Sequence, residues 1–303
     1  MEKIRIHVLR TGEVRVSPYL PFGGDHCNII KASGMTTPKS KWIWLPVFSF
    51  LIEHPKGLIL FDTGWHREMS PDGVYDKRAQ IKSLSSWLLY QVNQGRIAQG
   101  EAVDEQLARL GFKAADLDYV LLSHLDCDHA NGLRQVADAR HILVSKAEME
   151  GTRRRNPQIR IRFQKRWWQG VDLKTFDWNG AEGPVGKSYD VLGDGSLVMV
   201  NIPGHSEGLC ALKIRNTMLG RNHQGLGDGR IVTNDKKSKY VLLFADGGYA
   251  TKSWRDMITS GISLDKDLQR QSLQWIREQS LSPDCLESIA THDTDVTPHV
   301  IEL

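Results

Sequence analysis

Short apolar runs, each followed directly by a polar cluster, constrain the fold of this chain more than any other feature. Five such clusters occur, and each begins where a predicted strand ends: residues 61–64, 123–129, 203–206, 245–249 and 291–293. Every cluster offers an imidazole or a carboxylate. Loops that leave the same edge of a sheet can converge on one point. The pattern therefore predicts an α/β protein with a polar site at one sheet edge.

The segments between the clusters alternate predicted strands with predicted helices. Alternating apolar residues predict an opening strand at 4–8 and a hairpin of 47–53 with 57–61. Helical spacing predicts helices at 83–97, 101–110 and 264–279. Short apolar runs predict further strands at 118–123, 140–145, 196–202, 209–215, 240–245 and 286–291. The Gly-, Asn- and Asp-rich stretches 179–194 and 220–239 are predicted loops.

Length and composition indicate one globular domain over residues 1–303. Hydrophobic residues make up 40% of the chain and charged residues 25%, as in ordinary water-soluble proteins. The longest apolar runs, such as 47–52, are far shorter than the roughly 18 residues that cross a bilayer, so we expect no membrane span. The first residues alternate charged and apolar side chains, unlike a secretory signal, and the four cysteines form no CxxC pair. We therefore expect reduced thiols and a cytoplasmic protein.

The cluster 123–129 carries the strongest chemical signal. It places four side chains of metal-ligand type, His124, Asp126, Asp128 and His129, within six residues. Imidazole and carboxylate together suit Zn²⁺, Fe²⁺ or Mn²⁺. This spacing can serve two metal ions about 3.5 to 4 Å apart, which would share a bridging hydroxide. Metal binding lowers the pKa of a bound water molecule to about 7, so the hydroxide forms at neutral pH. The sequence therefore predicts a hydrolytic nucleophile at neutral pH.

The order of motifs resembles that of metallo-β-lactamase-fold hydrolases. The family pattern is Asp-Thr-Gly, His-x-His-x-Asp-His, Pro-Gly-His, a bridging Asp and a late His, and this chain has its counterparts at 62–64, 124–129, 203–205, Asp246 and His292. Residues 50–64, with Tyr249 three positions after the bridging Asp, look like the N-acyl-homoserine-lactone lactonase branch. The resemblance implies a single-domain, four-layer αββα sandwich with two divalent metal ions.

The resemblance also implies a role for each site residue. His124 and His205 would hold the first metal, Asp128, His129 and His292 the second, and Asp246 would bridge them. Asp62 would orient a ligand imidazole or the loop beside it. Zinc is the usual metal of the family, with manganese or iron as alternatives.

Asp126 departs from the family pattern, which usually has its second histidine there. An oxygen ligand at this position shifts the preference of the site towards harder metals. We expect Asp126 to coordinate the first metal directly. A water-mediated contact and a weakly occupied first site are the alternatives.

These implied roles predict a lactonase acting on an N-acyl-homoserine lactone or a similar cyclic ester. The metal-bridging hydroxide would attack the carbonyl, Tyr249 would donate a hydrogen bond to it or to the acyl group, and Asp128 would relay a proton to the departing alkoxide. A thioester or phosphodiester hydrolase of the same fold is the first alternative, because loops outside the metal motifs set the substrate. A non-catalytic metal- or ligand-binding protein is the second.

A basic, aromatic insertion at about 150–178 remains open in role. Residues 151–175 carry a local charge of +7, against −4 for the rest of the chain. The segment is interpreted as a solvated helix face, as a homodimer contact through its apolar side, or as a contact for a carboxylate-bearing or phosphorylated substrate. Because the remainder of the chain is negative, we do not expect nucleic-acid binding. The candidate substrate-binding residues are Arg153, Arg154, Arg155, Trp167 and Trp168.

Overall fold

Two β-sheets form the centre of the protein, whose computed structural model describes residues 3–217 and 238–303. The larger sheet has the order β13 (Val300–Glu302), β1 (Arg5–Val16), β2 (Ile43–His54), β3 (Gly57–Phe61), β5 (Tyr119–Leu121), β6 (His141–Ser145) and β7 (Leu173–Phe176), with β4 (Gln94–Arg96) paired to β1. The smaller sheet has the order β12 (Cys285–Ile289), β11 (Tyr240–Leu243), β10 (Cys210–Arg215), β9 (Leu197–Asn201) and β8 (Ser188–Asp190).

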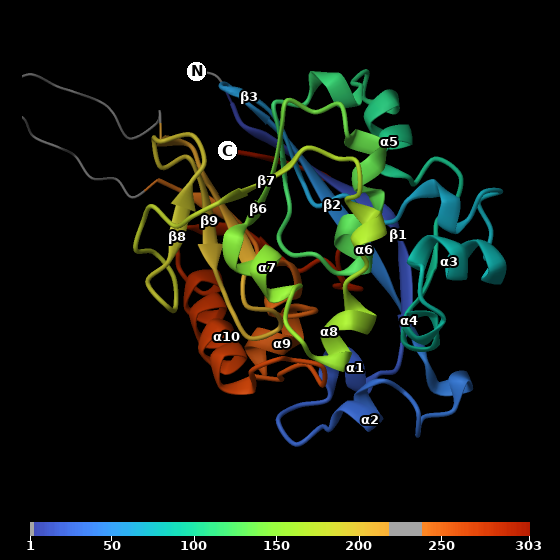
Figure 1. Ribbon diagram of the computed structural model, residues 1–303. Helices are drawn as coiled ribbons and strands as arrows, with labels where there is room; N and C mark the ends of the chain where they lie inside the picture. Colours follow the sequence, from blue (N-terminus) through green and yellow to red (C-terminus); the bar gives the residue numbers. More distant parts are fainter. Residues whose placement is uncertain (1–2, 218–237) are drawn as a thin grey trace, which may run out of the picture.

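Helices cover the outer faces of both sheets (Figure 1). They are α1 (Tyr19–Phe22), α2 (Ile29–Ala32), α3 (Lys77–Leu84), α4 (Trp87–Val92), α5 (Val103–Arg109), α6 (Cys127–Ala130), α7 (Lys146–Gly151), α8 (Pro157–Arg162), α9 (Thr251–Arg255) and α10 (Lys266–Ser280). The helices α9 and α10 lie on the smaller sheet, and α3 to α6 lie on the side of the larger sheet. Among the described residues, no helix is long and apolar enough to cross a bilayer.

Three apolar clusters hold these layers together. The side chains of Phe50, Phe61 and Leu212 lie in a cluster between the two sheets. A second cluster joins the larger sheet to its helices, and a third packs Leu273 and Ile276 of α10 against the smaller sheet. Each sheet therefore buries both faces, and the predicted αββα sandwich of one domain is confirmed.

The predicted hairpin 47–53 with 57–61 is confirmed as β2 and β3, which pair from Phe50↔Phe61 to His54↔Gly57. The predicted helix 264–279 is confirmed as α10. The loop predicted at 179–194 is wrong in part, because it contains the short strand β8. The loop predicted at 220–239 lies almost entirely outside the described residues.

The single helix predicted at 83–97 is wrong. The chain ends α3 at Ser85, whose φ of 54° is left-handed, and starts α4 with Ser86, whose Oγ accepts a hydrogen bond from Leu89 N. Residues 94–96 then pair with β1 as β4. Serine favours helix ends over helix interiors because its hydroxyl bonds locally to backbone groups, and this preference outweighs the apolar spacing here.

Candidate metal centre

Seven buried side chains of metal-ligand type lie together at one edge of the two sheets. They form two groups, and within each group the potential ligand atoms lie within 4.8 Å of one another. The first ligand group consists of His124, Asp126, His205 and Asp246, and the second of Asp128, His129 and His292. All seven were predicted as metal ligands, and the structure brings every one of them to this place.

The larger sheet supplies four of these residues through the segment after β5. Asp126 occupies the N-cap position of α6, so Asp128 and His129 lie in the first turn of that helix. The backbone N–H of His129 donates to Asp126 O at 3.1 Å, which closes the turn. This short turn brings three ligand side chains to one side of the chain within four residues.

The smaller sheet supplies the other three from the loops after β9, β11 and β12. Gly204 has a φ of +131°, and a Cβ there would lie 2.2 Å from the backbone nitrogen of Gln269 in α10. Glycine is therefore required for this close approach. Ser272 of α10 donates to Pro203 O at 2.7 Å, so α10 holds the loop that carries His205.

Asp246 lies between the two groups and presents one oxygen to each. Its Oδ1 lies 3.3 Å from His129 Nε2 and 3.1 Å from His292 Nε2. Its Oδ2 lies 3.6 Å from His205 Nε2 and 4.0 Å from His124 Nε2. This arrangement is compatible with a carboxylate that serves two metal ions.

Asp62 and Pro46 fix the orientation of two ligand imidazoles. Asp62 follows β3 with a left-handed φ of 58° and accepts hydrogen bonds from Ser123 N at 2.8 Å and from His129 Nδ1 at 2.8 Å. His292 Nδ1 donates to Pro46 O at 2.8 Å. Because Nδ1 is the donor in both rings, the Nε2 atoms turn towards Asp246 with a lone pair in the neutral imidazole.

Buried polar atoms without a hydrogen-bond partner mark a place where a divalent metal ion could bind. Among the described residues, His124 Nε2, His129 Nε2, His292 Nε2 and Asp246 Oδ1 are buried without a hydrogen-bond partner. Burial alone would lower the pKa of His129, but the charges of Asp62 and Asp246 hold it well above its usual value. The negative electrostatic potential of these carboxylates, which favours a protonated imidazole, also favours a bound metal cation. Nitrogen and carboxylate donors of this kind are those of zinc sites.

Glu148 joins the two ligand-bearing loops and was not predicted. It accepts hydrogen bonds from Leu125 N at 3.1 Å, Ser206 Oγ at 2.6 Å and Gly208 N at 3.1 Å. Its carboxylate is buried and lies in α7, outside every polar cluster of the sequence. No local pattern marks such a residue, because its partners are distant in the chain.

Asp126 is held by Arg162, the last residue of α8, which was not predicted as a site residue. Arg162 Nε donates to Asp126 Oδ1 at 2.5 Å and Nη2 to Oδ2 at 2.7 Å. Its Nη2 also lies 2.5 Å from His205 Nε2. Burial, and then the charge of Arg162, lower the pKa of His205 to about 4, so this ring is neutral at pH 7. An aspartate at the position where the family pattern has a histidine adds a buried negative charge. This charge is the signal in the sequence that a buried cation must lie nearby to compensate it.

Tyr249 covers the centre from the side of the smaller sheet. Its ring stacks on His292, with centroids 5.2 Å apart, and meets the edge of His205 at 5.8 Å. Burial, followed by the charges of Asp246 and Asp126, raises the pKa of its hydroxyl well above the usual value. The hydroxyl is therefore a hydrogen-bond donor at neutral pH.

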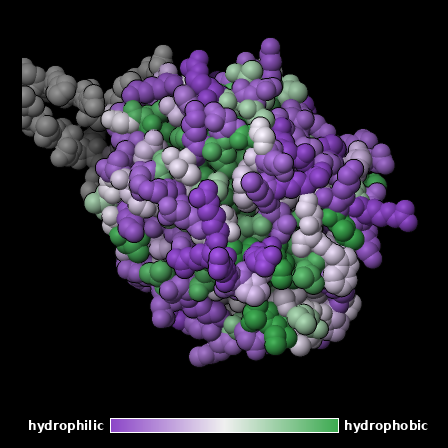
Figure 2. Space-filling view, in the orientation of Figure 1, coloured by the Kyte–Doolittle hydropathy of each residue, from purple (hydrophilic) through white to green (hydrophobic). Residues whose placement is uncertain are grey.

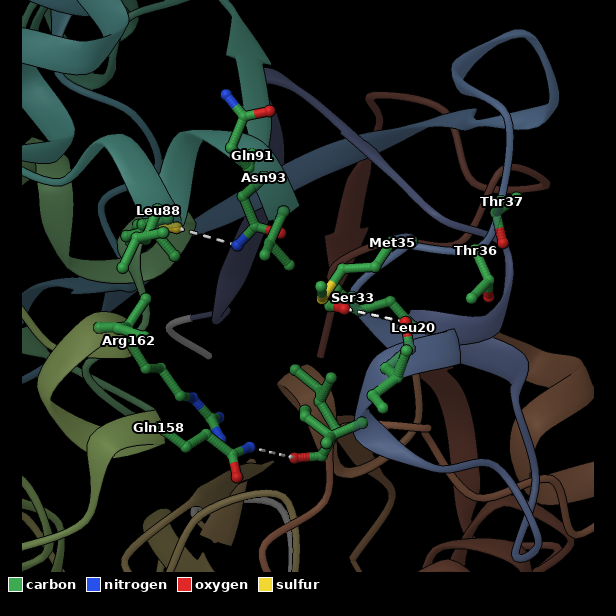
Figure 3. Close-up of a pocket in the computed structure, with 18 of the residues that line it drawn as sticks. Leu20, Ser33, Met35, Thr36, Thr37, Leu88, Gln91, Asn93, Gln158 and Arg162 are labelled. Carbon is green, nitrogen blue, oxygen red and sulfur yellow. Dashed lines mark hydrogen bonds between the residues drawn. The ribbon is translucent and has the colours of Figure 1, made fainter.

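A largely apolar cavity of about 930 Å³ opens beside the centre. Asp126, Cys127 and Arg162 line it where it meets the metal-ligand residues. Figure 3 shows walls from the segment Leu20 to Thr37, from the segment around Leu88 and Asn93, and from α8 with Gln158 and Arg162. Ile262, before α10, also lines the cavity. Apolar surface over α2, α4 and α8 is visible in Figure 2. The cavity can therefore hold an apolar group next to the centre.

The family model of the metallo-beta-lactamase superfamily matches residues 42–216, more than half of the chain. The chain belongs to this superfamily. The N-acyl homoserine lactonase AttM of Azorhizobium caulinodans is 28% identical over 270 residues, which cover 84% of each protein. The N-acyl homoserine lactonase of Bacillus cereus is 25% identical over 234 residues, which cover 77% of this chain and 76% of the relative.

Solved structures show the same superfamily fold. An N-acyl homoserine lactone hydrolase with the product N-hexanoyl-L-homoserine at its catalytic metal centre has a TM-score of 0.67 to this chain. It is 20% identical, and the match covers 96% of this chain and 94% of that one. The dizinc quorum-quenching lactonase AidC has a TM-score of 0.59 at 15% identity, with 96% and 87% covered.

In this superfamily member, the five residues that were candidates for substrate contact lie away from the cavity. Trp167 is fully buried, and its Nε1 donates to Ser83 O at 3.2 Å. Trp168 packs against the same core. Arg153, Arg154 and Arg155 are exposed, and Arg154 pairs with Glu207 at 2.5 Å. The apolar residues of the segment serve the core, and Arg162 is a basic residue of the same segment that reaches the centre. Substrate contact by the five candidates stays a prediction.

Proposed function

We propose that this protein is a metal-dependent hydrolase that opens the ring of a lactone, namely an N-acyl-homoserine lactone or a similar cyclic ester. The observation that carries the proposal is that the two ligand groups lie between the ring of Tyr249, which stacks on His292, and an apolar cavity that meets them at Asp126. The lactonase relatives, which align over most of the chain, support the same substrate class.

The proposed ligand sets follow the two groups. His124, Asp126 and His205 would hold the first metal, and Asp128, His129 and His292 the second. Asp246 would serve both, because it presents one oxygen to each group. Divalent metal ions held there polarise a carbonyl and lower the pKa of a water molecule. Zinc is our proposal for the metal, because nitrogen and carboxylate donors are those of catalytic zinc sites.

Two side chains handle protons in the proposed reaction. The Tyr249 hydroxyl donates a hydrogen bond to the lactone carbonyl oxygen as negative charge develops there. Burial raises the pKa of Asp128, so its carboxyl group is suited to carry a proton to the ring oxygen when the C–O bond breaks. Asp62 keeps the His129 ring in place throughout.

The cavity accounts for the acyl part of the substrate. Leu88, Val92 and Ile161 contribute apolar wall, and Asn93 and Gln158 contribute amide groups that can hydrogen-bond an amide linkage. Each methylene group that moves from water into such a wall contributes about 0.8 kcal/mol. We therefore propose that longer acyl chains bind more tightly.

We also propose a reducing, cytoplasmic location. All four cysteines lie in the described part of the chain and are free. Burial raises the pKa of the Cys127 and Cys210 thiols, so neither is a reactive thiolate at neutral pH.

Elemental analysis and a substrate panel test the function together. The panel contains N-butanoyl- and N-decanoyl-homoserine lactone, a simple γ-lactone, a glutathione thioester and a bis-aryl phosphodiester. We expect bound transition metal and turnover of the lactones, with the lower KM for the decanoyl compound. Turnover of only the thioester or the phosphodiester would replace the lactonase with another hydrolase of this fold. Absence of both metal and turnover would favour a binding protein.

A variant of the cavity wall tests the acyl site. Leu88, which is 52% exposed, lines the cavity, and L88K places a charge there. We expect the KM for the decanoyl lactone to rise about tenfold, while the butanoyl lactone changes less than about threefold. Leu281 is 65% exposed and does not line the cavity, so L281K is the matched control. Equal effects of L88K on both substrates would place the acyl chain elsewhere.

A further inference from the structure

The guanidinium group of Arg162 lies inside the first ligand group. Its side chain is only 8% exposed, and its three nitrogens all have partners there. Nε and Nη2 bind the two oxygens of Asp126 at 2.5 and 2.7 Å, and Nη1 donates to His205 O at 2.9 Å. The pair is bidentate and buried, which is the strongest geometry between these two side chains.

The same Nη2 atom lies 2.5 Å from His205 Nε2, the nitrogen that faces the first group. An imidazole nitrogen has a single lone pair in the ring plane. It can accept a hydrogen bond from Arg162 or bind a metal at about 2.0 to 2.1 Å, but not both. Arginine does not lose its proton in proteins, so its donor cannot become an acceptor or a ligand.

The second ligand group carries no such competitor among the described residues. His129 Nε2 and His292 Nε2 are buried and without a hydrogen-bond partner, and both face Asp246 Oδ1. The two ligand groups therefore differ in what a metal must displace. Both imidazoles of the second group offer free lone pairs. In the first group His124 Nε2 is also without a partner, but Arg162 occupies Asp126 and His205.

We propose that Arg162 competes with a metal ion for the first ligand group. The second group then fills first and more tightly, and the first group fills only when the guanidinium leaves His205. The cavity provides room for this movement, because Arg162 lies on its wall as well as in the ligand group (Figure 3). The inference rests on the proposed metal centre and adds an order of loading to it.

Stepwise zinc binding tests the competition without any measurement of activity. Chelator-treated protein is titrated with Zn²⁺ against a competing metal indicator, and the two dissociation constants are compared. In the wild type we expect the second equivalent to bind at least about 100-fold more weakly than the first. R162Q should narrow this gap at least about tenfold, mainly by tightening the second equivalent.

Arg166 provides a matched control in the same segment. It lies 3.6 Å from Glu68 and outside both ligand groups, so R166Q removes the same charge without freeing a ligand. We expect its two dissociation constants to equal those of the wild type. Equal narrowing in R166Q would mean that net charge, and not occupancy by Arg162, controls the loading, which would overturn the proposal.

A double variant keeps the test decisive if R162Q does not fold because Asp126 is left buried and unpaired. D126H combined with R162Q leaves no uncompensated charge and places a neutral ligand in the first group. We expect two equivalents of similar affinity. Unchanged or weakened second binding in R162Q would show that Arg162 supports Asp126 as a ligand, and unchanged second binding in the double variant would show that Arg162 does not limit loading. Either result overturns the competition alone. If neither the wild type nor any variant binds zinc, the proposed metal centre and the proposed competition by Arg162 are both wrong.

Discussion

The buried carboxylates near Tyr249 determine the protonation state of its hydroxyl group. Its ring is fixed between His292 and His205, and the nearby charges of Asp246 and Asp126 make loss of its proton unfavourable. In the proposed reaction, a hydroxyl that stays protonated beside the centre is suited to stabilise the negative charge that develops on the carbonyl oxygen.

Replacing Tyr249 with phenylalanine keeps the stacked ring and removes only the hydroxyl. We expect kcat for lactone hydrolysis to fall about 10²-fold, as when one donor to a developing oxyanion is lost, while metal content stays at the wild-type level. Steady-state kinetics with elemental analysis measure both. Y189F is the control, because the half-buried Tyr189 stacks on Phe176 and lies outside both ligand groups. Unchanged turnover in Y249F would remove the hydroxyl from the reaction.

At this scale the sequence predicts the ligands but not what surrounds them. His124, His129 and His205 stand in short motifs whose spacing follows from one turn after a strand, so the local pattern is sufficient. Arg162 and Glu148 reach the site from helices that bear no motif, and their partners are 36 and 58 residues away in the chain, respectively. Only the packing of α7 and α8 against the loops brings them there.

Between elements, a partly buried network of Glu182, Lys213 and Arg215 connects the loop before β8 to β10 and α10. Glu182 Oε1 accepts from Lys213 Nζ at 2.8 Å and from Arg215 Nη2 at 2.6 Å. Lys213 Nζ also donates to Gln279 Oε1 at 2.7 Å, and its side chain is only 8% exposed. Burial lowers the pKa of Lys213 and thus opposes its charge, which Glu182 compensates.

Replacing Glu182 with glutamine should destabilise the protein most at neutral pH. Burial opposes the charge of Glu182, but Arg215 and Lys213 hold its pKa below the usual 4.5. A lowered folded pKa contributes stability above pH 4.5 that is lost as the pH falls through the folded pKa. We expect E182Q to cost about 1 to 3 kcal/mol at pH 7.

Thermal unfolding of wild type and E182Q from pH 3 to pH 7 measures this dependence. The two curves of Tm against pH should converge at the acid end. E278Q, at an exposed position of α10, is the control and should follow the wild type throughout. A constant difference between E182Q and the wild type at every pH would mean that the glutamate acts through its shape and not through its charge.

Element prediction succeeded where one physical signal dominated. Alternation and a tight turn identified β2 and β3, and one apolar face identified α10. The helix predicted over 83–97 failed because Ser85 and Ser86 end one helix and cap the next, and because β4 finds its partner in β1, about 80 residues earlier. Pairing between distant strands leaves no periodic trace in either segment.

Across the whole molecule, the ligand residues connect the two sheets. The loops after β5 in the larger sheet carry His124 and His129, whereas those after β9, β11 and β12 in the smaller sheet carry His205, Asp246 and His292. The apolar cluster between the sheets packs their faces but leaves the lone pairs at this edge unsatisfied. Metal ions bound there would connect the two sheets. The free energy of metal binding would then stabilise the folded protein, because the site is lost on unfolding.

Metal removal should therefore lower global stability. At a free metal concentration about 1,000 times Kd, one ion stabilises the folded state by about 4 kcal/mol. We expect the Tm to fall by several degrees after dialysis against a chelator and to recover when Zn²⁺ is added. D246N should reduce this difference, because Asp246 faces both groups, whereas H299A, outside both, should retain it in full. Calorimetry that gave the same Tm with and without metal would show that apolar packing alone holds the two sheets together.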